Sequence, residues 1–525
     1  MTESNRSSAA RKPSFALVWL AMPLIFAVAL GLRVWGAFFD LPYIYHPDEP
    51  VNIKVIHAMV MDHDPNPHYF RYPSLVYDLD VAATWVYFGL PAILSDKQWA
   101  ISDPLTLAMG TTYTSSPDAV VLYRSLTICA ALLSIVLVYL IGRRGHSERA
   151  GVIAAALMAI SPVVVAESRY VTPDSYVVLF ELLTILMCLR IAQSGRMAHY
   201  LLAGGAVGAT AASKYNGALI CLTVVAAHAL HFGPAPRHWE KLLMAGACSA
   251  LVFLVFTPFA LLDAQTFITD SMYEFGHYAS HHQGMEGGGS TWYLRELWTG
   301  MGVAAVLAAG KAAGCLGGRS ALCVVLVSFA VPYLLFISSF HVHNDRTMLP
   351  IVPCALLLAA MMFVDLASAR SPLHGVAPGL RWAALAVLGV ALLLIPVRHT
   401  IEQSIAITTI DSRTTAREWI DSTLPDNALI AIESYSPFVD PTRFRIVQSE
   451  RAIDHTASWY EENSVDYVVL SEGMFGRYFG DPRTYAPEVS RYLQLMQAMT
   501  LVKRFNDGGY EVAVFQTSPG AANAP

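Results

Sequence analysis

The sequence has little charge. Only 14% of its 525 residues are Asp, Glu, Lys or Arg, whereas 55% are hydrophobic. In an ordinary soluble domain about a quarter of the residues are charged, so this composition points away from that class. The lysines and arginines are also too dispersed to form the basic surface of a nucleic-acid-binding protein. We therefore expect a membrane protein without a nucleic-acid partner.

Cysteine is missing from the long polar loops. The seven cysteines all lie within or beside apolar runs, and no two have the Cys-x-x-Cys spacing. This pattern predicts buried, unpaired thiols and neither a structural disulfide nor a zinc cluster. The cysteines are Cys129, Cys188, Cys221, Cys248, Cys315, Cys323 and Cys354. No heptad or fixed-period repeat appears.

Long apolar runs are what the sequence has in abundance. Runs of roughly 17–25 residues recur, which is long enough to cross the core of a bilayer. The first, from Phe15 to about Phe39, is too long for a signal-peptide core and no small-residue cleavage site follows it, so we expect it to be retained. About eleven spans are predicted: 15–38, 119–141, 150–167, 175–193, 198–213, 217–233, 241–262, 296–316, 320–340, 347–368 and 381–397.

The apolar stretch 75–94 is treated differently. It carries Asp78 and Asp80, which are costly at bilayer depth, so we place it as a helix on or dipping into the outer surface. With the N-terminus inside, every inner segment then carries Lys or Arg, as the positive-inside rule requires. If 75–94 crossed the bilayer, the cluster at Arg143 would move outside and this pattern would break.

This topology divides the chain into three parts. Residues 1–14 form a cytoplasmic tail, 15–399 a transmembrane domain with a long first outer loop at 40–117, and 400–525 an extracytoplasmic domain. The last part is charged and alternates β-rich with helical runs, which predicts a small α/β domain. The expected strands are 428–433, 467–470 and 510–515, and the expected helices are 414–422 and 489–499.

The first outer loop contains two adjacent carboxylates, Asp48 and Glu49, directly after the first span. An aspartate there can take a proton from an acceptor hydroxyl, or it can hold a divalent cation. The alternative is a helix cap, because both residues favour a helix start at residue 50. Asp62-His63-Asp64 further along has the pattern of a metal-binding DxD signature, but the prolines after it favour a turn.

Three later outer segments also carry charge. Asp174 lies close to Glu167 and Arg169, and capping of the next helix is its alternative role. Lys214 can contact a phosphate or snorkel to water, and Arg346 can hold a lipid phosphate or pair with Asp345 or headgroups. The loop 263–295 reads as a flexible lid, with a metal site at His277 and His281 as the other interpretation.

These motifs, in this order on a multispan chain, resemble the GT-C glycosyltransferases that use lipid-linked sugars. The pattern is most similar to family 39, which includes the protein O-mannosyltransferases, and to the bacterial aminoarabinose transferases that act on lipid A. The likeness covers roughly residues 15–370. Its elements are Asp48-Glu49, Tyr72-Pro73-Ser74-Leu75, Ser168-Arg169-Tyr170 with Asp174, Lys214, and Arg346 with Leu349-Pro350.

The resemblance implies a polyprenyl-phosphate sugar as donor and an inverting transfer at the outer face of the cell membrane. Asp48 would be the catalytic base, aided by Glu49, and Asp174 the second acidic residue. The donor phosphate would be held by Arg346, Lys214 and Arg169, and the substrate contacted by His46, Tyr72 and His343. Some relatives use a divalent cation, so Mg²⁺ or Mn²⁺ at Asp48 and Asp174 stays open. The acceptor implied is a glycolipid, a polysaccharide or a protein.

Two other classes of function compete with this one. A transporter or flippase of lipid-linked sugars would place polar residues near the bilayer midplane, whereas these spans are nearly free of charge apart from Glu181. A sensor that binds through its outer domain would have no need to gather Asp48, Asp174 and Arg346. These three residues would then lie more than ~15 Å apart, well beyond direct contact.

Overall fold

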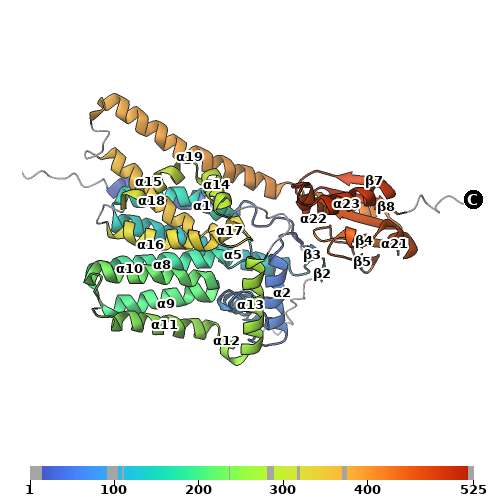
Figure 1. Ribbon diagram of the computed structural model, residues 1–525, viewed down its shortest axis with the longest axis horizontal. Coiled ribbons are helices and arrows are strands. Elements are labelled where there is room, and N and C mark those ends of the chain that lie inside the picture. The colour runs from blue at the N-terminus through green and yellow to red at the C-terminus, as the bar shows by residue number, and fades with distance from the viewer. Residues whose placement is uncertain are drawn as a thin grey trace, which may run out of the picture.

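The computed structural model describes residues 15–90, 105–108, 111–235, 237–280, 289–315, 320–368 and 375–517. Long helices lie side by side in one bundle, and a mixed β-sheet with its own helices sits at one end of it (Figure 1). The bundle contains α1 (Phe15–Val34), α5 (Pro117–Gly145), α6 (Glu148–Ala159), α7 (Pro162–Glu167), α8 (Asp174–Ser194), α9 (Met197–Ser213), α10 (Cys221–Phe232), α11 (Glu240–Phe256), α15 (Val303–Cys315), α16 (Ala321–Ser338), α18 (Ile351–Ala367) and α19 (Pro378–Thr408).

The helices have the length and composition of a multi-pass membrane protein. Within the described part of the chain, five helices are long and apolar enough to cross a bilayer, and a bent pair would make a sixth. Most of their neighbours are shorter than 18 residues, so the count of eleven spans stays a prediction. A large cluster of Leu, Ile, Val and Ala side chains fills the space between the helices.

Two predicted spans are not single helices. The predicted span 296–316 is not one straight helix, because a bend of 118° separates α14 (Gly289–Met301) from α15. Gly302 makes this bend with φ of +53°, a left-handed conformation that glycine adopts without a steric penalty. The predicted span 150–167 is divided into α6 and α7, and Thr400 Oγ1 donates a hydrogen bond of 2.7 Å to the freed carbonyl of Ile160.

Short helices and a small three-stranded sheet lie at the end of the bundle that faces the C-terminal five-stranded sheet. Part of the segment expected to be a flexible lid is helical, since α13 covers 264–279, while His281 lies outside the described residues. The short elements here are α2 (Glu49–Met61), α3 (Leu75–Thr84), η1 (Trp85–Gly89), η2 (Tyr215–Ile220), α12 (Phe259–Leu262), α13 (Ala264–Ala279), α17 (Asp345–Met348), β1 (Tyr43–Ile44), β2 (Leu105–Ala108) and β3 (Thr111–Tyr113).

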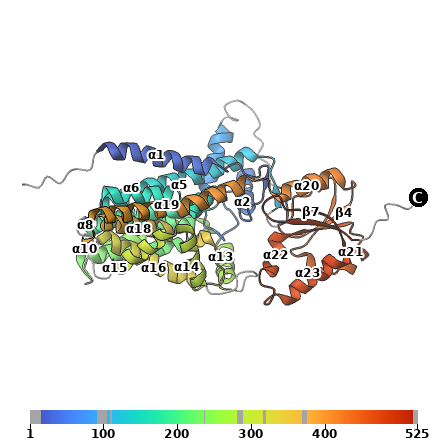
Figure 2. The ribbon, with the colours of Figure 1, turned by 90° about the horizontal axis from the view of Figure 1, so that it is seen from above.

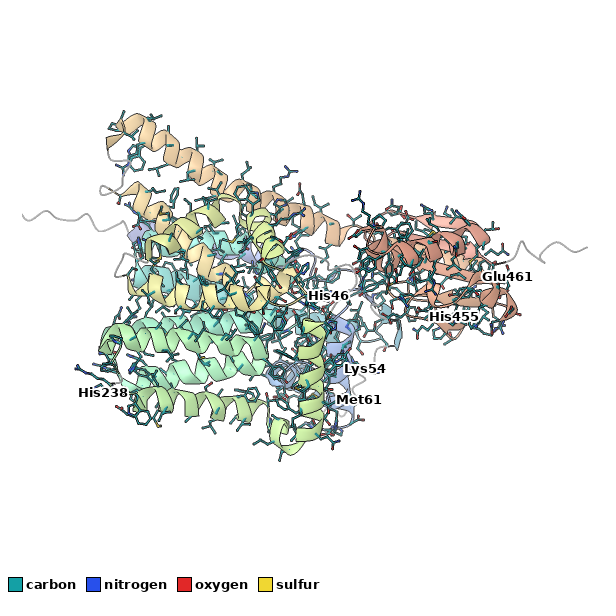
Figure 3. The ribbon with its side chains drawn as sticks, in the orientation of Figure 1. His46, Lys54, Met61, His238, His455 and Glu461 are labelled. Carbon is teal, nitrogen blue, oxygen red and sulfur yellow. A yellow bond between two sulfur atoms is a disulfide. The ribbon has the colours of Figure 1, made fainter. Side chains whose placement is uncertain are left out.

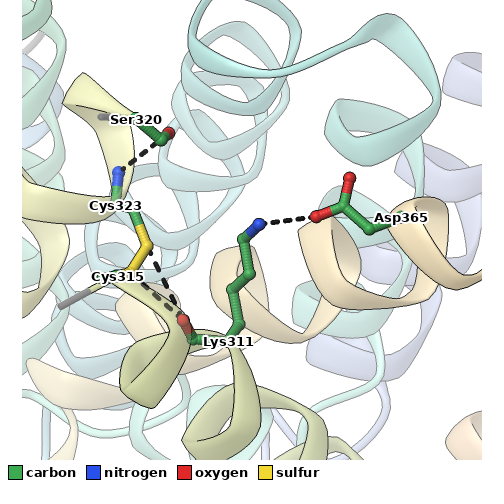
Figure 4. Close-up of a disulfide and its surroundings, with 5 residues drawn as sticks. All are labelled: Lys311, Cys315, Ser320, Cys323 and Asp365. Carbon is green, nitrogen blue, oxygen red and sulfur yellow. Dashed lines mark hydrogen bonds and ion pairs between the residues drawn. A yellow bond between two sulfur atoms is a disulfide. The ribbon is translucent and has the colours of Figure 1, made fainter. Parts of the chain in front are cut away.

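The cysteine prediction is wrong for one pair. Cys315 at the end of α15 and Cys323 in the first turn of α16 form a disulfide (Figure 4). Lys311 lies beside it and pairs with Asp365 of α18 at 2.5 Å. Two helix ends that face each other across a short connection bring these thiols together, which spacing along the chain did not reveal. The other five cysteines are free, and Cys129 and Cys221 among them are exposed.

The C-terminal region is a three-layer α/β domain. Its sheet has the order β5-β4-β6-β8-β7, in which β4 pairs in parallel with β5 and β6, while β8 is antiparallel to β6 and β7. One helix covers one face and the remaining helices cover the other (Figure 2). The elements are α20 (Ser412–Thr423), β4 (Leu429–Ile432), β5 (Arg445–Gln448), η4 (Ala452–Asp454), α21 (Ala457–Glu462), β6 (Tyr467–Ser471), α22 (Glu472–Phe479), α23 (Ala486–Ala498), β7 (Thr500–Phe505) and β8 (Val512–Gln516).

The sheet domain is attached to the bundle through the segment between α1 and α5. The Arg413 guanidinium lies 4.1 Å from the ring of Tyr45 and donates to the Tyr45 carbonyl at 3.3 Å. Phe438 packs against the rings of Tyr43 and Tyr113 at 5.7 and 5.6 Å. These contacts hold the segment just before Asp48 against the sheet domain, so the domain positions the loop in which the candidate site begins.

Candidate functional site

Asp48 lies at the junction between the three-stranded sheet of β1, β2 and β3 and helix α2. It occupies the N-cap position of α2, and its main-chain carbonyl accepts from Asn52 N at 3.3 Å. The Asp48 carboxylate, however, forms an ion pair with Arg346 of the short helix α17. The backbone of Asp48 thus starts the helix, while its side chain makes no capping hydrogen bond and pairs with Arg346, so its catalytic role stays a prediction.

Glu49 is held in a buried ion pair behind Asp48. Arg124 of α5 donates to both carboxylate oxygens, from Nε at 2.9 Å and from Nη2 at 2.7 Å. Val171 N donates to Oε1 at 2.9 Å, and both charged side chains are completely buried. Burial alone would raise the pKa of Glu49, but the Arg124 charge outweighs it and lowers the pKa below its usual value. These contacts tie the start of α2 to α5 through Arg124 and to the segment before α8 through Val171.

Asp174 and Lys214 form a second charged pair. Asp174 is the first residue of α8, and Lys214 follows the last residue of α9. Lys214 Nζ lies 2.8 Å from Asp174 Oδ1, and Lys214 is only 8% exposed, so it does not snorkel to water. Burial disfavours the charged amine, but the Asp174 carboxylate outweighs it and raises the pKa of Lys214. The ring of Tyr72 lies 5.9 Å from the Lys214 amine.

His46 lies beside the charged residues. Its ring stacks on Tyr170 at 4.1 Å, and its Nδ1 accepts from Asp48 N at 3.3 Å. Burial lowers the pKa of His46 to about 4, so the ring is neutral at pH 7. Figure 3 shows His46 between the bundle and the sheet domain. A neutral imidazole here can exchange hydrogen bonds with a sugar without adding charge.

Two of the predicted site residues have other contacts. Arg169 Nη2 donates to the Leu32 carbonyl and to Ser404 Oγ, each at 2.6 Å, and so ties α1 to α19. His343 packs on Trp292 at 4.8 Å, and its Nδ1 lies 2.9 Å from the His341 carbonyl oxygen. The phosphate role of Arg169 and the substrate role of His343 therefore stay predictions.

One residue of the site, Arg124, had no clear signal in the sequence. Arg124 lies inside a predicted span, so its role as the partner of Glu49 was hidden. Asp345 precedes Arg346, and burial and the charges of Glu296 and Asp174 raise its pKa. Burial lowers the pKa of Arg346 to about 10, which leaves it protonated at neutral pH. Asp345 and Arg346 are adjacent in the chain, so α17 links Asp48 with the surroundings of Asp174.

The divalent cation considered at Asp48 and Asp174 stays a prediction. No group of three or more His, Cys, Asp or Glu side chains in that part of the chain could hold a metal ion. Asp48 and Asp174 each face a cation, which would compete with a metal for the carboxylate. Asp64 accepts from Asn66 N at 2.8 Å, which confirms the turn at Asp62-His63-Asp64.

The sequence and the fold were compared with those of known proteins. Residues 84–261 match the family model of dolichyl-phosphate-mannose-protein mannosyltransferase. Comparison with curated proteins gave no match. The fold is similar to that of the Archaeoglobus fulgidus oligosaccharyltransferase, with 13% identity, a TM-score of 0.56, and coverage of 97% of this chain and 75% of that chain.

A second likeness is to ArnT from Cupriavidus metallidurans. Its apo structure has 16% identity and a TM-score of 0.54, and the match covers 95% of this chain and 98% of that chain. The structure of the same protein bound to undecaprenyl phosphate has 15% identity and a TM-score of 0.53, with 98% and 100% covered. The chain described here is a multi-pass membrane protein with the GT-C fold.

Proposed function

We propose that this protein is a glycosyltransferase that moves a sugar from a polyprenyl-phosphate donor to an acceptor at the outer surface of the membrane, with inversion. The observation that carries the proposal is the meeting of the Asp48 carboxylate with Arg346 at the sheet-domain end of the bundle. A carboxylate and a guanidinium are the base and the phosphate-binding group that such a transfer requires. The similar ArnT structure bound to undecaprenyl phosphate supports the class of donor.

In the proposed reaction Asp48 removes the proton from the acceptor hydroxyl. The acceptor oxygen attacks the anomeric carbon as the bond between that carbon and the phosphate oxygen breaks, and the electron pair of this bond leaves with the polyprenyl phosphate. Arg346 stabilises the charge that develops on the phosphate, and attack from the opposite side inverts the anomeric centre. No step requires a metal.

The other charged residues keep the reacting groups in place. Glu49 is fully buried and bonded to Arg124 and Val171 N, so we assign it to holding Asp48 in position. Asp174 and Lys214 hold the ends of α8 and α9 together beside the site, and Lys214 gives it a positive charge near Tyr72. His46 offers a neutral ring for the sugar.

The proposed membrane orientation follows from the charge bias of the loops. The N-terminus is cytoplasmic, and the site and the sheet domain lie outside, where glycolipid, polysaccharide and protein acceptors are present. Glu181, the carboxylate expected within a span, is buried in α8 with Cys354 Sγ at 3.6 Å. The charged pairs gather instead at the end of the bundle next to the sheet domain, which favours surface chemistry over transport.

The direct test is the Asp48→Asn variant, assayed for sugar transfer from an undecaprenyl-phosphate sugar. Loss of a general base typically lowers the rate by about 10²–10⁴-fold, and we expect a loss in this range. Asp426→Asn is the matched control, because Asp426 also pairs with an arginine, Arg443, but on the exposed surface of the sheet domain. Full transfer by a folded Asp48→Asn protein would contradict the assignment.

A further inference from the structure

The Asp48–Arg346 ion pair occupies both groups that the proposed reaction needs. A donor phosphate requires the Arg346 guanidinium, which is paired with Asp48. The acceptor hydroxyl requires Asp48 as a base, and a carboxylate stabilised by an adjacent positive charge accepts a proton less readily. The same contact therefore opposes donor binding and weakens the base.

This pair is the most accessible of the three pairs at this end of the bundle. The side chains of Asp48 and Arg346 are 28% and 19% exposed, against 4% and 10% for Asp174 and Lys214. The Glu49–Arg124 pair is completely buried. Separation of a buried pair leaves uncompensated charges away from water, whereas a partly exposed pair can exchange partners at a much smaller cost.

The backbone around Arg346 is fixed independently of this pair. Asn344 caps α17, since its Oδ1 accepts from Thr347 N at 2.9 Å and from Thr347 Oγ1 at 2.6 Å. Arg346 N donates to Asp345 Oδ1 at 2.9 Å, and the buried Arg346 Nε has no partner among the described residues. The guanidinium can thus turn from a carboxylate to a phosphate while α17 stays in place, and its fork suits phosphate oxygens.

We propose that Asp48 and the donor phosphate compete for Arg346, so that donor binding breaks the ion pair and frees Asp48 to act as the base. This inference rests on the proposed function. The exchange makes and breaks no covalent bond: Arg346 keeps its protons, the phosphate replaces the carboxylate, and Asp48 remains ionised. It also imposes an order, because the donor must bind before Asp48 can take the acceptor proton.

The test compares the binding of undecaprenyl phosphate to full-length proteins in lipid nanodiscs. Asp48→Asn removes the competing charge, so we expect it to bind about threefold to tenfold more tightly than the unmodified protein. Arg346→Gln should bind more weakly, and Asp48→Asn added to Arg346→Gln should give no gain. Asp426→Asn is the control and should not change the affinity, since its partner Arg443 lies in the sheet domain.

Two results would contradict the proposed competition. One is that folded Asp48→Asn binds undecaprenyl phosphate no more tightly than the unmodified protein. The other is that Asp48→Asn increases the affinity equally when Arg346 is already replaced by Gln. Asp48→Ser, checked for monodispersity, serves as a second variant if Asp48→Asn does not fold. The assignment of Asp48 as the base is tested independently of the competition for Arg346. Tighter binding with full transfer would retain the competition and reject Asp48 as base, whereas unchanged binding with lost transfer would do the reverse.

Discussion

Two buried glutamates, one at the start of α2 and one in the sheet domain, show how the partner of a buried carboxylate decides its charge. Glu49 faces Arg124, which outweighs burial and lowers its pKa. Glu433, just after β4, accepts from Ala452 N at 2.9 Å, Ser471 N at 2.8 Å and the Tyr492 hydroxyl at 2.7 Å. These donors are neutral, so burial prevails and raises the pKa of Glu433 to about 7.

The difference between the pKa values of Glu49 and Glu433 shows what keeps a carboxylate of the site ionised. A buried carboxylate stays ionised when a full positive charge faces it, whereas neutral hydrogen bonds only partly offset desolvation. At the sheet-domain end of the bundle, Asp48, Glu49 and Asp174 are each matched with a cation. These three carboxylates therefore lie in balanced pairs, whereas the pKa of neighbouring Asp345 is raised, and an incoming anion can enter by exchange with one of the pairs. The interior of the sheet domain is instead sensitive to pH.

The strongest test of this comparison is to break the Glu49 pair. Glu49→Gln leaves Arg124 buried without a charge partner, and removal of one member of such a pair costs about 3–5 kcal/mol in the free energy of unfolding. Unfolding of the purified protein in detergent, followed by circular dichroism, would measure the loss. The double variant Glu49→Gln/Arg124→Gln should recover part of it. A loss equal to that of an exposed pair would mean that Glu49 is solvated in the protein.

The second test uses pH on Glu433. Below the unfolded-state pKa near 4.5, Glu433 is protonated in both states and contributes no pH dependence. Between this value and about 7 the unfolded chain loses the proton first, so stability falls as pH rises, by on the order of 3 kcal/mol. Hydrogen exchange of peptides covering β4 and β6, corrected for intrinsic rates, would measure the trend.

The Glu433→Gln variant is the control for that trend. It cannot ionise, so its stability should lack this part of the dependence between pH 4.5 and 7. If the variant has the same slope as the unmodified protein, another group causes the change. The exposed carboxylates of the sheet domain are present in both proteins and cancel in the comparison.

A smaller effect is expected at Asp174. Asp174→Asn keeps an oxygen that can accept from Lys214 but removes the charge, and loss of a charged hydrogen bond costs about 1.5–3 kcal/mol. Without the carboxylate, burial would lower the pKa of Lys214 below its unfolded value of 10.5, so the stability of the variant should rise as the pH rises toward that value. Thermal unfolding at pH 7 and at pH 9 would show a smaller loss at pH 9. A loss that grows from pH 7 to pH 9 would contradict the charge-based account.

The smallest effect is expected at Asp64, a carboxylate on the surface. It accepts from Asn66 N and pairs with His68 at 3.0 Å, which forms a turn. Asn also favours this type of turn, so Asp64→Asn should leave sugar transfer and the unfolding temperature unchanged. A large loss of transfer would restore a substrate or metal role for Asp62-His63-Asp64.

Local patterns predicted much of the fold. The apolar runs coincide with helices of the bundle, and the strands expected at 428–433, 467–470 and 510–515 correspond to β4, β6 and β8. The edge strands β5 and β7 were missed because their residues are mostly exposed or half-buried and lack a continuous apolar run. The bend at Gly302 was missed because the hydropathy of the segment is continuous across it.

The sequence predicted most residues of the candidate site, but it did not predict which of them form ion pairs with each other. Asp48, Asp174, Lys214 and Arg346 were singled out because charge is rare in this chain and each follows or precedes an apolar run. That Arg346 faces Asp48, and Lys214 faces Asp174, depends on how α2, α8, α9 and α17 converge. Arg124 shows the limit most clearly, since nothing local distinguishes it from a membrane-boundary arginine.

The sequence by itself determined that this is a membrane protein with charged loops and a separate α/β domain, because hydropathy, charge and periodicity are properties of neighbouring residues. Only the tertiary structure decided which cation neutralises each carboxylate, which thiols meet and which residues lose contact with water. Those outcomes depend on contacts between segments that are far apart in the chain. The pKa of Glu49 and that of Glu433 diverge for this reason, although both residues are buried glutamates.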